Sequence, residues 1–147
     1  VSCFPEAKII HLKRDPMAVC WSNFKNYFPS PMMAFSYTQR DVAQYYCLYD
    51  EMMRFWERRF PGTIIRLDYD NLTENQESEI RTLLNSLDLP WEDGVLDFYK
   101  SDRPVTTASA WQVREKIYRG SSREWKNYEK WLSPMIEELS SGGHSPG

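Results

Sequence analysis

Arg14 and Ser22 are two side chains whose types and spacing suit anion binding. Arg14 follows the apolar run at residues 9–12, which predicts a short β-strand. Asp15 and Pro16 then predict the start of a helix, because Asp is a favourable N-cap and Pro fits the first helical position. Ligands of parallel sheets lie beyond the carboxyl ends of the strands, where Arg14 stands. A guanidinium, the Ser22 hydroxyl on the polar face of the expected helix and that helix's N-terminus would form a competent phosphate site.

The same residues also allow a simpler interpretation. Arg14 could form an ion pair at the surface, and Ser22 could be an ordinary exposed helix residue, since short strand-Arg-helix patterns are common. The residues alone leave both interpretations open.

The next part of the chain predicts a long helix over residues 39–60. Thr38, followed by Asp41 three residues later, is typical of a helix N-terminus, and Pro61 with Gly62 ends the pattern. Apolar residues recur at helical spacing and predict a buried stripe. These are Val42, Tyr45, Tyr46, Tyr49, Met52, Met53, Trp56 and Phe60.

A second strand-helix unit follows. Residues 63–69 predict a strand, and residues 73–76 predict a capping box that opens another helix. Two such units predict an α/β fold in which a parallel sheet carries flanking helices. Nearer the C-terminus, Ser121 and Glu124 predict the capping box of a last helix over residues 122–139.

Length and composition limit the classes of protein to consider. The chain has 147 residues, which is one globular domain at most; we expect the domain to occupy residues 1–139 and residues 140–147 to form a disordered tail. The net charge of -3 gives no electrostatic support for nucleic-acid binding. No apolar run is long enough for a membrane span. Three cysteines without metal-ligand spacing and two isolated histidines predict a reducing, cytoplasmic location and no metal site.

The segment from Phe4 to Pro16, together with Ser22, resembles the 3′-phosphate-binding segment of sulfotransferases that use 3′-phosphoadenosine 5′-phosphosulfate (PAPS). In that family an arginine ends the strand, and a serine eight residues later helps to hold the 3′-phosphate of the nucleotide. The resemblance therefore implies that Arg14 and Ser22 bind this phosphate.

A second segment, from Tyr69 to Leu72, resembles the family's Tyr-Glu step after a strand, with Asp70 in place of Glu. The family tyrosine contacts the adenosine part of the nucleotide, which implies this role for Tyr69. By residue type alone, Tyr69 could equally be a half-buried tyrosine that supports a turn.

A third segment, from Tyr118 to Asn127, resembles the signature Arg-Lys-Gly-x-x-Gly-Asp-Trp-Lys-Asn, whose Lys-Gly step cradles the 3′-phosphate. Arg119 and Gly120 fall on that step, whereas Tyr118 replaces the first arginine and Arg123-Glu124 replace Gly-Asp. A cation beside a flexible glycine just before a helix N-terminus is also what an anion site needs. The resemblance implies that Arg119 and Gly120 contact the nucleotide.

Ser109 is the one catalytic candidate. It lies in the range 107–113, which resembles a serine-containing loop that approaches the reacting sulfuryl group in tyrosylprotein and bacterial sulfotransferases. The resemblance implies that Ser109 lies near the reaction centre.

The resemblance runs from Phe4 to about Leu139 and implies the C-terminal portion of a sulfotransferase domain. It implies a helix-rich, P-loop-NTPase-like parallel sheet that is incomplete, because the strand-loop-helix that grips the phosphosulfate and the catalytic Glu or His would precede Val1. The parent protein would transfer a sulfuryl group from PAPS to a hydroxyl acceptor and release 3′-phosphoadenosine 5′-phosphate (PAP). We expect the isolated chain to supply nucleotide contacts and to show no turnover.

Several alternatives stay open at this point. The chain could be a non-catalytic nucleotide-binding or interaction module of the same fold. A nucleoside or nucleotide kinase is disfavoured, because the glycines never form a Walker pattern. The acceptor could be a tyrosyl peptide, a carbohydrate or a small hydroxylated compound. An exposed sheet edge would offer a route to a homo-oligomer.

Overall fold

The computed structural model describes residue 4 and residues 6–100 and 119–144 of the chain. The elements, in order, are β1 (Ile9–Lys13), α1 (Pro16–Lys25), the 3₁₀ helix η1 (Pro31–Tyr37), α2 (Gln39–Arg59), β2 (Ile64–Asp68), α3 (Tyr69–Glu74), α4 (Gln76–Ser86), and the 3₁₀ helices η2 (Phe98–Lys100) and η4 (Ser121–Trp131), then α5 (Ser133–Ser141). The predicted helix-rich α/β class is confirmed for this part of the chain.

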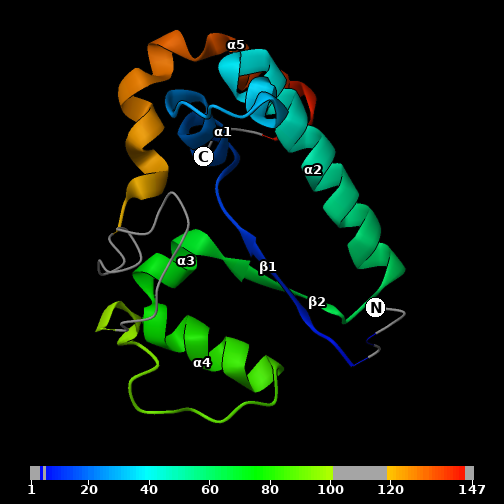
Figure 1. The fold of residues 1–147 in the computed structure, drawn as a ribbon, viewed down its shortest axis with the longest axis vertical. Coiled ribbons are helices and arrows are strands. Elements are labelled where there is room, and N and C mark those ends of the chain that lie inside the picture. Colours follow the sequence, from blue (N-terminus) through cyan, green and yellow to red (C-terminus); the bar gives the residue numbers. More distant parts are fainter. Residues whose placement is uncertain (1–3, 5, 101–118, 145–147) are drawn as a thin grey trace.

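The two strands form a parallel pair at the centre of the molecule. Their register aligns Ile9 with Ile64 and Lys13 with Asp68, so both strands end at the same edge of the sheet. Helices α1, α2, α5 and η4 lie together on one side of the strands, and α3 and α4 lie on the other (Figure 1). This arrangement brings the residues that follow β1 and β2 close together.

Local hydrogen bonds explain why the first helices begin where they do. The Asp15 carboxylate accepts a bond of 2.7 Å from the Ala18 amide, and Pro16 occupies the first turn of α1. The Thr38 hydroxyl accepts a bond of 3.1 Å from the Asp41 amide at the start of α2. Both predicted helix N-termini are confirmed. In each, the capping side chain accepts a hydrogen bond from an amide that has no partner within the helix.

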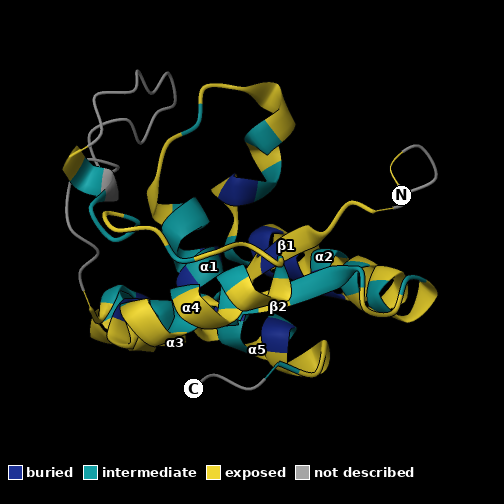
Figure 2. Ribbon diagram, turned by 90° about the horizontal axis from the view of Figure 1, so that it is seen from below, coloured by how far each residue is buried: buried dark blue, intermediate teal, exposed yellow. Residues whose placement is uncertain are grey.

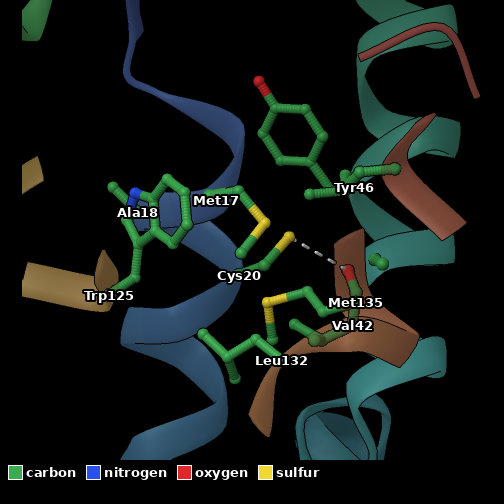
Figure 3. Packing of buried hydrophobic residues seen from close by; sticks show 10 residues of the cluster. Met17, Ala18, Cys20, Val42, Tyr46, Trp125, Leu132 and Met135 are labelled. Atoms are coloured by element: carbon green, nitrogen blue, oxygen red, sulfur yellow. Dashed lines mark hydrogen bonds between the residues drawn. The ribbon is translucent and has the colours of Figure 1, made fainter. Parts of the chain in front are cut away.

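The core lies between α1, α2, η4 and α5. Its buried residues are Met17, Ala18, Cys20, Val42, Ala43, Tyr46, Trp125, Leu132, Met135 and Leu139, and Figure 3 shows eight of them labelled around the α1–α2 contact. Burial raises the pKa of the Cys20 thiol to about 12. The core therefore joins the beginning, middle and end of the chain.

The predicted buried stripe of α2 is only partly correct. Val42 and Tyr46 are buried, but Tyr45, Met52 and Trp56 are exposed by 53%, 51% and 40%. One apolar face of α2 packs against α1 and α5, whereas the second is covered only in part, by η1 through the stacked rings of Phe35 and Tyr45. Residues 51–59 of the helix are mostly exposed (Figure 2). Periodicity identifies apolar positions but does not say which face meets the core.

The capping box predicted over residues 73–76 is wrong. A short helix, α3, precedes α4, and its N-cap is Asp68, whose carboxylate accepts a 2.8 Å bond from the Asn71 amide. Thr73 lies inside α3, and its hydroxyl donates to the Asp70 carbonyl at 2.9 Å. Asp68, the last residue of β2, starts α3 ahead of Thr73 because Asp is a better N-cap than Thr, and α4 then begins after Asn75 without a side-chain cap.

The predicted last helix is in fact two elements, η4 and α5. Gly120 precedes η4 with a φ of 87°, and no side chain caps this helix, so the capping box predicted for Ser121 and Glu124 is also wrong. Glu124 instead forms a 2.7 Å ion pair with Lys25. Pro134 lies in the first turn of α5, where its missing amide costs least.

The expected boundary at residue 139 also shifts. Helix α5 continues to Ser141, and the His144 amide donates to the Leu139 carbonyl at 2.9 Å, so residues 140–144 are not a disordered tail. A Cβ at Gly142 would lie 2.4 Å from Cys47 Sγ, which means that glycine is needed for this close approach to α2. Residues 145–147 lie outside the described part of the chain.

The sheet is exposed where larger parallel sheets are covered. Ile9, Ile10 and Leu12 of β1 are exposed by 42%, 46% and 49%, although parallel strands are usually buried on both faces. None of the described helices is long and apolar enough to cross a bilayer. The described residues also contain no cluster of three His, Cys, Asp or Glu that could hold a metal ion.

Asp50 of α2 is a buried carboxylate that ties β1 to the helix. It accepts a 2.8 Å bond from Lys13 and pairs with Arg54 at 2.7 Å, and His144 lies 3.7 Å away. Burial acts to raise the pKa of Asp50, but the Lys13 hydrogen bond and the charges of Lys13, Arg54 and His144 outweigh it, and the pKa lies below its usual value.

We therefore expect Asp50→Asn to lower the free energy of unfolding at neutral pH by about 2 kcal/mol, because charged hydrogen bonds are lost while the partly exposed partners regain water. A carboxylate with a lowered folded-state pKa stabilises the fold above its unfolded pKa, and this contribution disappears as pH falls through the folded-state pKa. Urea unfolding at several pH values should show the two proteins converging below about pH 4. The exposed Asp93→Asn is the matched control, and an equal loss at all pH values would contradict the assignment.

Candidate anion-binding site

Arg14 is held from two directions at the carboxyl end of β1. Its Nε donates a 2.9 Å hydrogen bond to Oγ of Ser122, which lies 108 residues further along the chain. Its guanidinium also lies 4.8 Å from the centre of the Tyr69 ring, within the range of a cation-π contact. The two terminal nitrogens of Arg14 form no hydrogen bond with any described residue. The contacts with Ser122 and Tyr69 therefore hold the guanidinium in place and leave its two terminal nitrogens available as donors to a ligand.

Tyr69 completes this contact because β2 ends beside β1. It is the first residue of α3, and its hydroxyl lies 3.5 Å from the Ser121 hydroxyl. The strands, α3 and η4 thus meet at one point: Arg14 and Tyr69 come from the two strand ends, and Ser121 and Ser122 come from the start of η4.

A cleft of about 630 Å³ opens next to these residues. It lies between the N-terminus of α1, helix α3 and the beginning of η4, and Ser122 connects it to Arg14. The lining residues are Asp15, Asp70, Thr73, Glu74, Arg119, Gly120, Ser122, Arg123, Trp125 and Lys126. A volume of this size accommodates a ligand as large as a nucleotide.

The charges of the cleft are divided between two walls. The basic wall carries three cationic side chains. Arg123 and Lys126 belong to η4, and Arg119 lies just before Gly120, which begins that helix. The Arg119 guanidinium also donates to the Glu74 carbonyl at 3.0 Å, which positions it across the cleft. The Arg123 amide already donates to the Gly120 carbonyl at 3.0 Å, but the amides of Ser121 and Ser122 have no partner among the described residues, and they add to the positive character of this wall.

The acidic wall belongs to α1 and α3 and carries Asp15, Asp70 and Glu74. The pKa of Asp15 is raised mainly by burial, and the nearby Asp70 charge raises it further, while the Ala18 amide and the Arg14 charge act in the opposite direction. An anion is favoured at the basic wall, whereas hydroxyl and amino groups of a ligand can donate hydrogen bonds to the acidic wall.

Ser22 does not join this group. It lies two turns into α1, on the side where Lys25 pairs with Glu124, and its carbonyl accepts a 2.7 Å bond from the Asn26 side chain. Its hydroxyl forms no hydrogen bond with a described residue, and it does not line the cleft. Ser109 lies outside the described residues.

Among the predicted site residues, Arg119 and Gly120 line the cleft. Arg14 and Tyr69 do not line it, but they contact each other beside it, and Arg14 reaches it through Ser122. The structure also identifies residues that the sequence reasoning did not assign to a site, above all Ser122 and Trp125. Both occur in the segment from Tyr118 to Asn127, so the signal was present, but Ser122 falls on a variable position of the signature and Trp125 reads equally well as a core residue. The sequence predicts Asp15 only as a helix cap, and the structure shows that it also lines the cleft.

Comparison with known proteins connects this geometry to a family. A sequence model described as "Sulfotransferase family" matches residues 1–93. An uncharacterized protein of Aquifex aeolicus (strain VF5) is 46% identical over 141 residues, which cover 95% of this chain and 18% of that protein. The chain thus spans less than a fifth of the length of this relative. The family match includes both strands together with Arg14, Ser22 and Tyr69, and the chain belongs to the sulfotransferase family.

Proposed function

We propose that this chain forms the 3′-phosphate- and adenosine-binding part of a sulfotransferase that transfers a sulfuryl group from PAPS to a hydroxyl acceptor. The main support is the contact of Arg14 with Ser122 and Tyr69. This contact joins all three segments that resemble the family's nucleotide-binding segments, although Arg14 and Ser122 are 108 residues apart in the chain.

Each residue has a role that follows from its position. The terminal nitrogens of Arg14, which have no hydrogen-bond partner among the described residues, form a fork that matches two oxygens of a phosphate. Arg119 and the Gly120 turn add charge and backbone donors on the basic wall. Tyr69 offers an aromatic surface to the adenosine, and the acidic wall offers acceptors to its hydroxyl and amino groups. Ser22 would add a hydroxyl only if the phosphate extends along α1 beyond the cleft.

PAPS supplies the activated sulfuryl group, and the residues of this chain hold the nucleotide part that leaves. Fixed positive charge near a leaving phosphate stabilises the charge that develops on it during group transfer. We further propose that Ser109 approaches the reacting group, that the chain belongs to one domain that includes the whole of α5 and so extends past residue 139, and that the sheet is part of a P-loop-like fold. The exposed faces of β1 are consistent with additional covering elements.

The experiment that tests this function is equilibrium binding of nucleotides to the 147-residue chain. We expect PAP to bind at least tenfold more tightly than adenosine 5′-monophosphate, because only PAP carries the 3′-phosphate that the basic wall accepts. Trp125 lines the cleft, so quenching of tryptophan fluorescence provides a signal, with calorimetry as a second measurement. ATP is the control for general nucleotide binding. ATP binding as tightly as PAP, or no discrimination for the 3′-phosphate, would contradict the proposal.

A further inference from the structure

Helix α2 carries a second apolar face that the described chain covers only at one end, where the Phe35 ring of η1 stacks on Tyr45 with the ring centres 3.9 Å apart. Tyr45, Leu48, Met52 and Phe55 are all at least half exposed, and Leu48 is exposed by 64%. Their spacing of three, four and three residues is that of the a and d positions in a coiled coil. We call these four residues the outer seam.

The outer seam lies on the opposite side of α2 from the core. The buried residues Val42, Ala43, Tyr46 and Asp50 face the core that α2 shares with α1 and α5. Helix α2 runs along one edge of the molecule (Figure 1), and helical spacing places the outer seam on the side of α2 away from these buried residues. Four large apolar side chains in one continuous row differ from the scattered exposed residues of an ordinary surface, and such rows mark interaction sites.

Charged residues at the two ends of the outer seam favour one occupant. Asp41 lies one turn before Tyr45, and Arg59 lies one turn after Phe55, so both extend the same row. Neither forms an ion pair with a described residue, although the Arg59 guanidinium lies 5.6 Å from the Phe60 ring. The row therefore reads acid, four apolar residues, base.

We propose that α2 mediates antiparallel self-association of two copies of this chain through the outer seam. This direction places Asp41 of each copy against Arg59 of the other, Tyr45 against Phe55, and Leu48 against Met52. A parallel pair would instead place Asp41 against Asp41 and Arg59 against Arg59. The antiparallel pair is a closed two-fold arrangement, in which the same patch of each copy forms the interface.

The geometry also predicts the strength of the pair. The outer seam is ~17 Å long at 1.5 Å per residue, which is short for a permanent dimer, so the dimer should be weak and depend on concentration. Glu51 flanks the seam near its middle, close to the two-fold axis, and there it would face its own counterpart. This like-charge contact weakens the dimer further.

The first test is sedimentation of the 147-residue chain over a range of concentrations. The expected result is a monomer-dimer equilibrium, and Leu48→Lys should raise the dissociation constant at least tenfold because it removes apolar contact and adds a charge. Leu48 is exposed, so the variant should fold normally. Leu89→Lys is the matched control, since Leu89 is exposed by 50% but does not lie on α2. A chain that stays monomeric at all concentrations would show that another partner, or none, covers the seam, and would overturn the proposal.

The second test asks whether the two α2 helices of the dimer run antiparallel. Asp41→Arg and Arg59→Asp should each weaken the dimer several-fold, and the double variant should restore it, because the antiparallel contacts are exchanged rather than lost. Glu51→Gln should tighten it. Circular dichroism confirms that each variant keeps its helices. A double variant no stronger than the single variants would exclude the antiparallel arrangement. Because sedimentation is measured without nucleotide, these results do not depend on the proposed nucleotide site.

Discussion

Arg14→Ala should lower the affinity for PAP about 100-fold. Hydrogen bonds between charged groups contribute about 1.5–3 kcal/mol each, and we propose that both terminal nitrogens of Arg14 donate to the 3′-phosphate. Loss of about 3 kcal/mol corresponds to roughly two orders of magnitude in the dissociation constant. The contact with Ser122 fixes the guanidinium before the ligand binds, so little ordering is needed on binding. Calorimetric titration of both proteins with PAP measures the change.

Three comparisons separate phosphate recognition from a general loss of structure. Arg14→Lys should recover only part of the affinity, because an ammonium has the charge but not the fork. Binding of adenosine 5′-monophosphate should change little in either variant. Arg40→Ala removes an exposed arginine of α2 that does not line the cleft, and it should bind PAP normally. If both nucleotides lose affinity equally in Arg14→Ala, Arg14 does not read the 3′-phosphate.

Met135→Ala should lower the free energy of unfolding by about 3 kcal/mol. Met135 is fully buried, and its side chain fills the space where α5 meets α1 and α2 (Figure 3). Truncating a buried methionine removes apolar contacts and leaves a cavity, which costs about 2–5 kcal/mol in comparable cores. Because the core joins both ends of the chain, this loss should appear in the cooperative unfolding transition. Urea denaturation followed by circular dichroism measures it.

Met32→Ala makes the same chemical change at a position that is 87% exposed. It should alter the free energy of unfolding by less than about 0.5 kcal/mol, as surface substitutions usually do. Similar losses in the two variants would mean that Met135 does not occupy a packed core, and that the arrangement of α5 against α1 and α2 is different in solution.

Features that depend on neighbouring residues were predictable from the sequence. The start of α1 rests on Asp15 and Pro16, and the start of α2 rests on Thr38; in each case the decisive interaction spans only three residues. The parallel pairing of β1 and β2 follows from the repeated strand-helix order. Arg14 and Tyr69 could be placed at one sheet edge because each directly follows its strand.

Features that depend on distant parts of the chain were not predictable. Nothing near Arg14 indicates that Ser122 will bind its Nε, because 108 residues separate them. The helical spacing of α2 is the same on both faces, so Tyr45 and Met52 could not be distinguished from Val42 before the packing was known. Likewise, Ser121 fits a capping box, yet the backbone at Gly120 and the Glu124–Lys25 ion pair direct both side chains elsewhere.

The close approach of Gly142 to Cys47 has a chemical consequence. An oxygen or alkyl group bonded to the Cys47 sulfur would compete for the space beside Gly142, where even one added carbon would lie 2.4 Å from that sulfur. Burial and the charges of Glu138 and Asp50 raise the pKa of Cys47, so little reactive thiolate forms while the segment is in place. Oxidation or alkylation of this cysteine and closure of the C-terminal turn are thus thermodynamically linked: each disfavours the other.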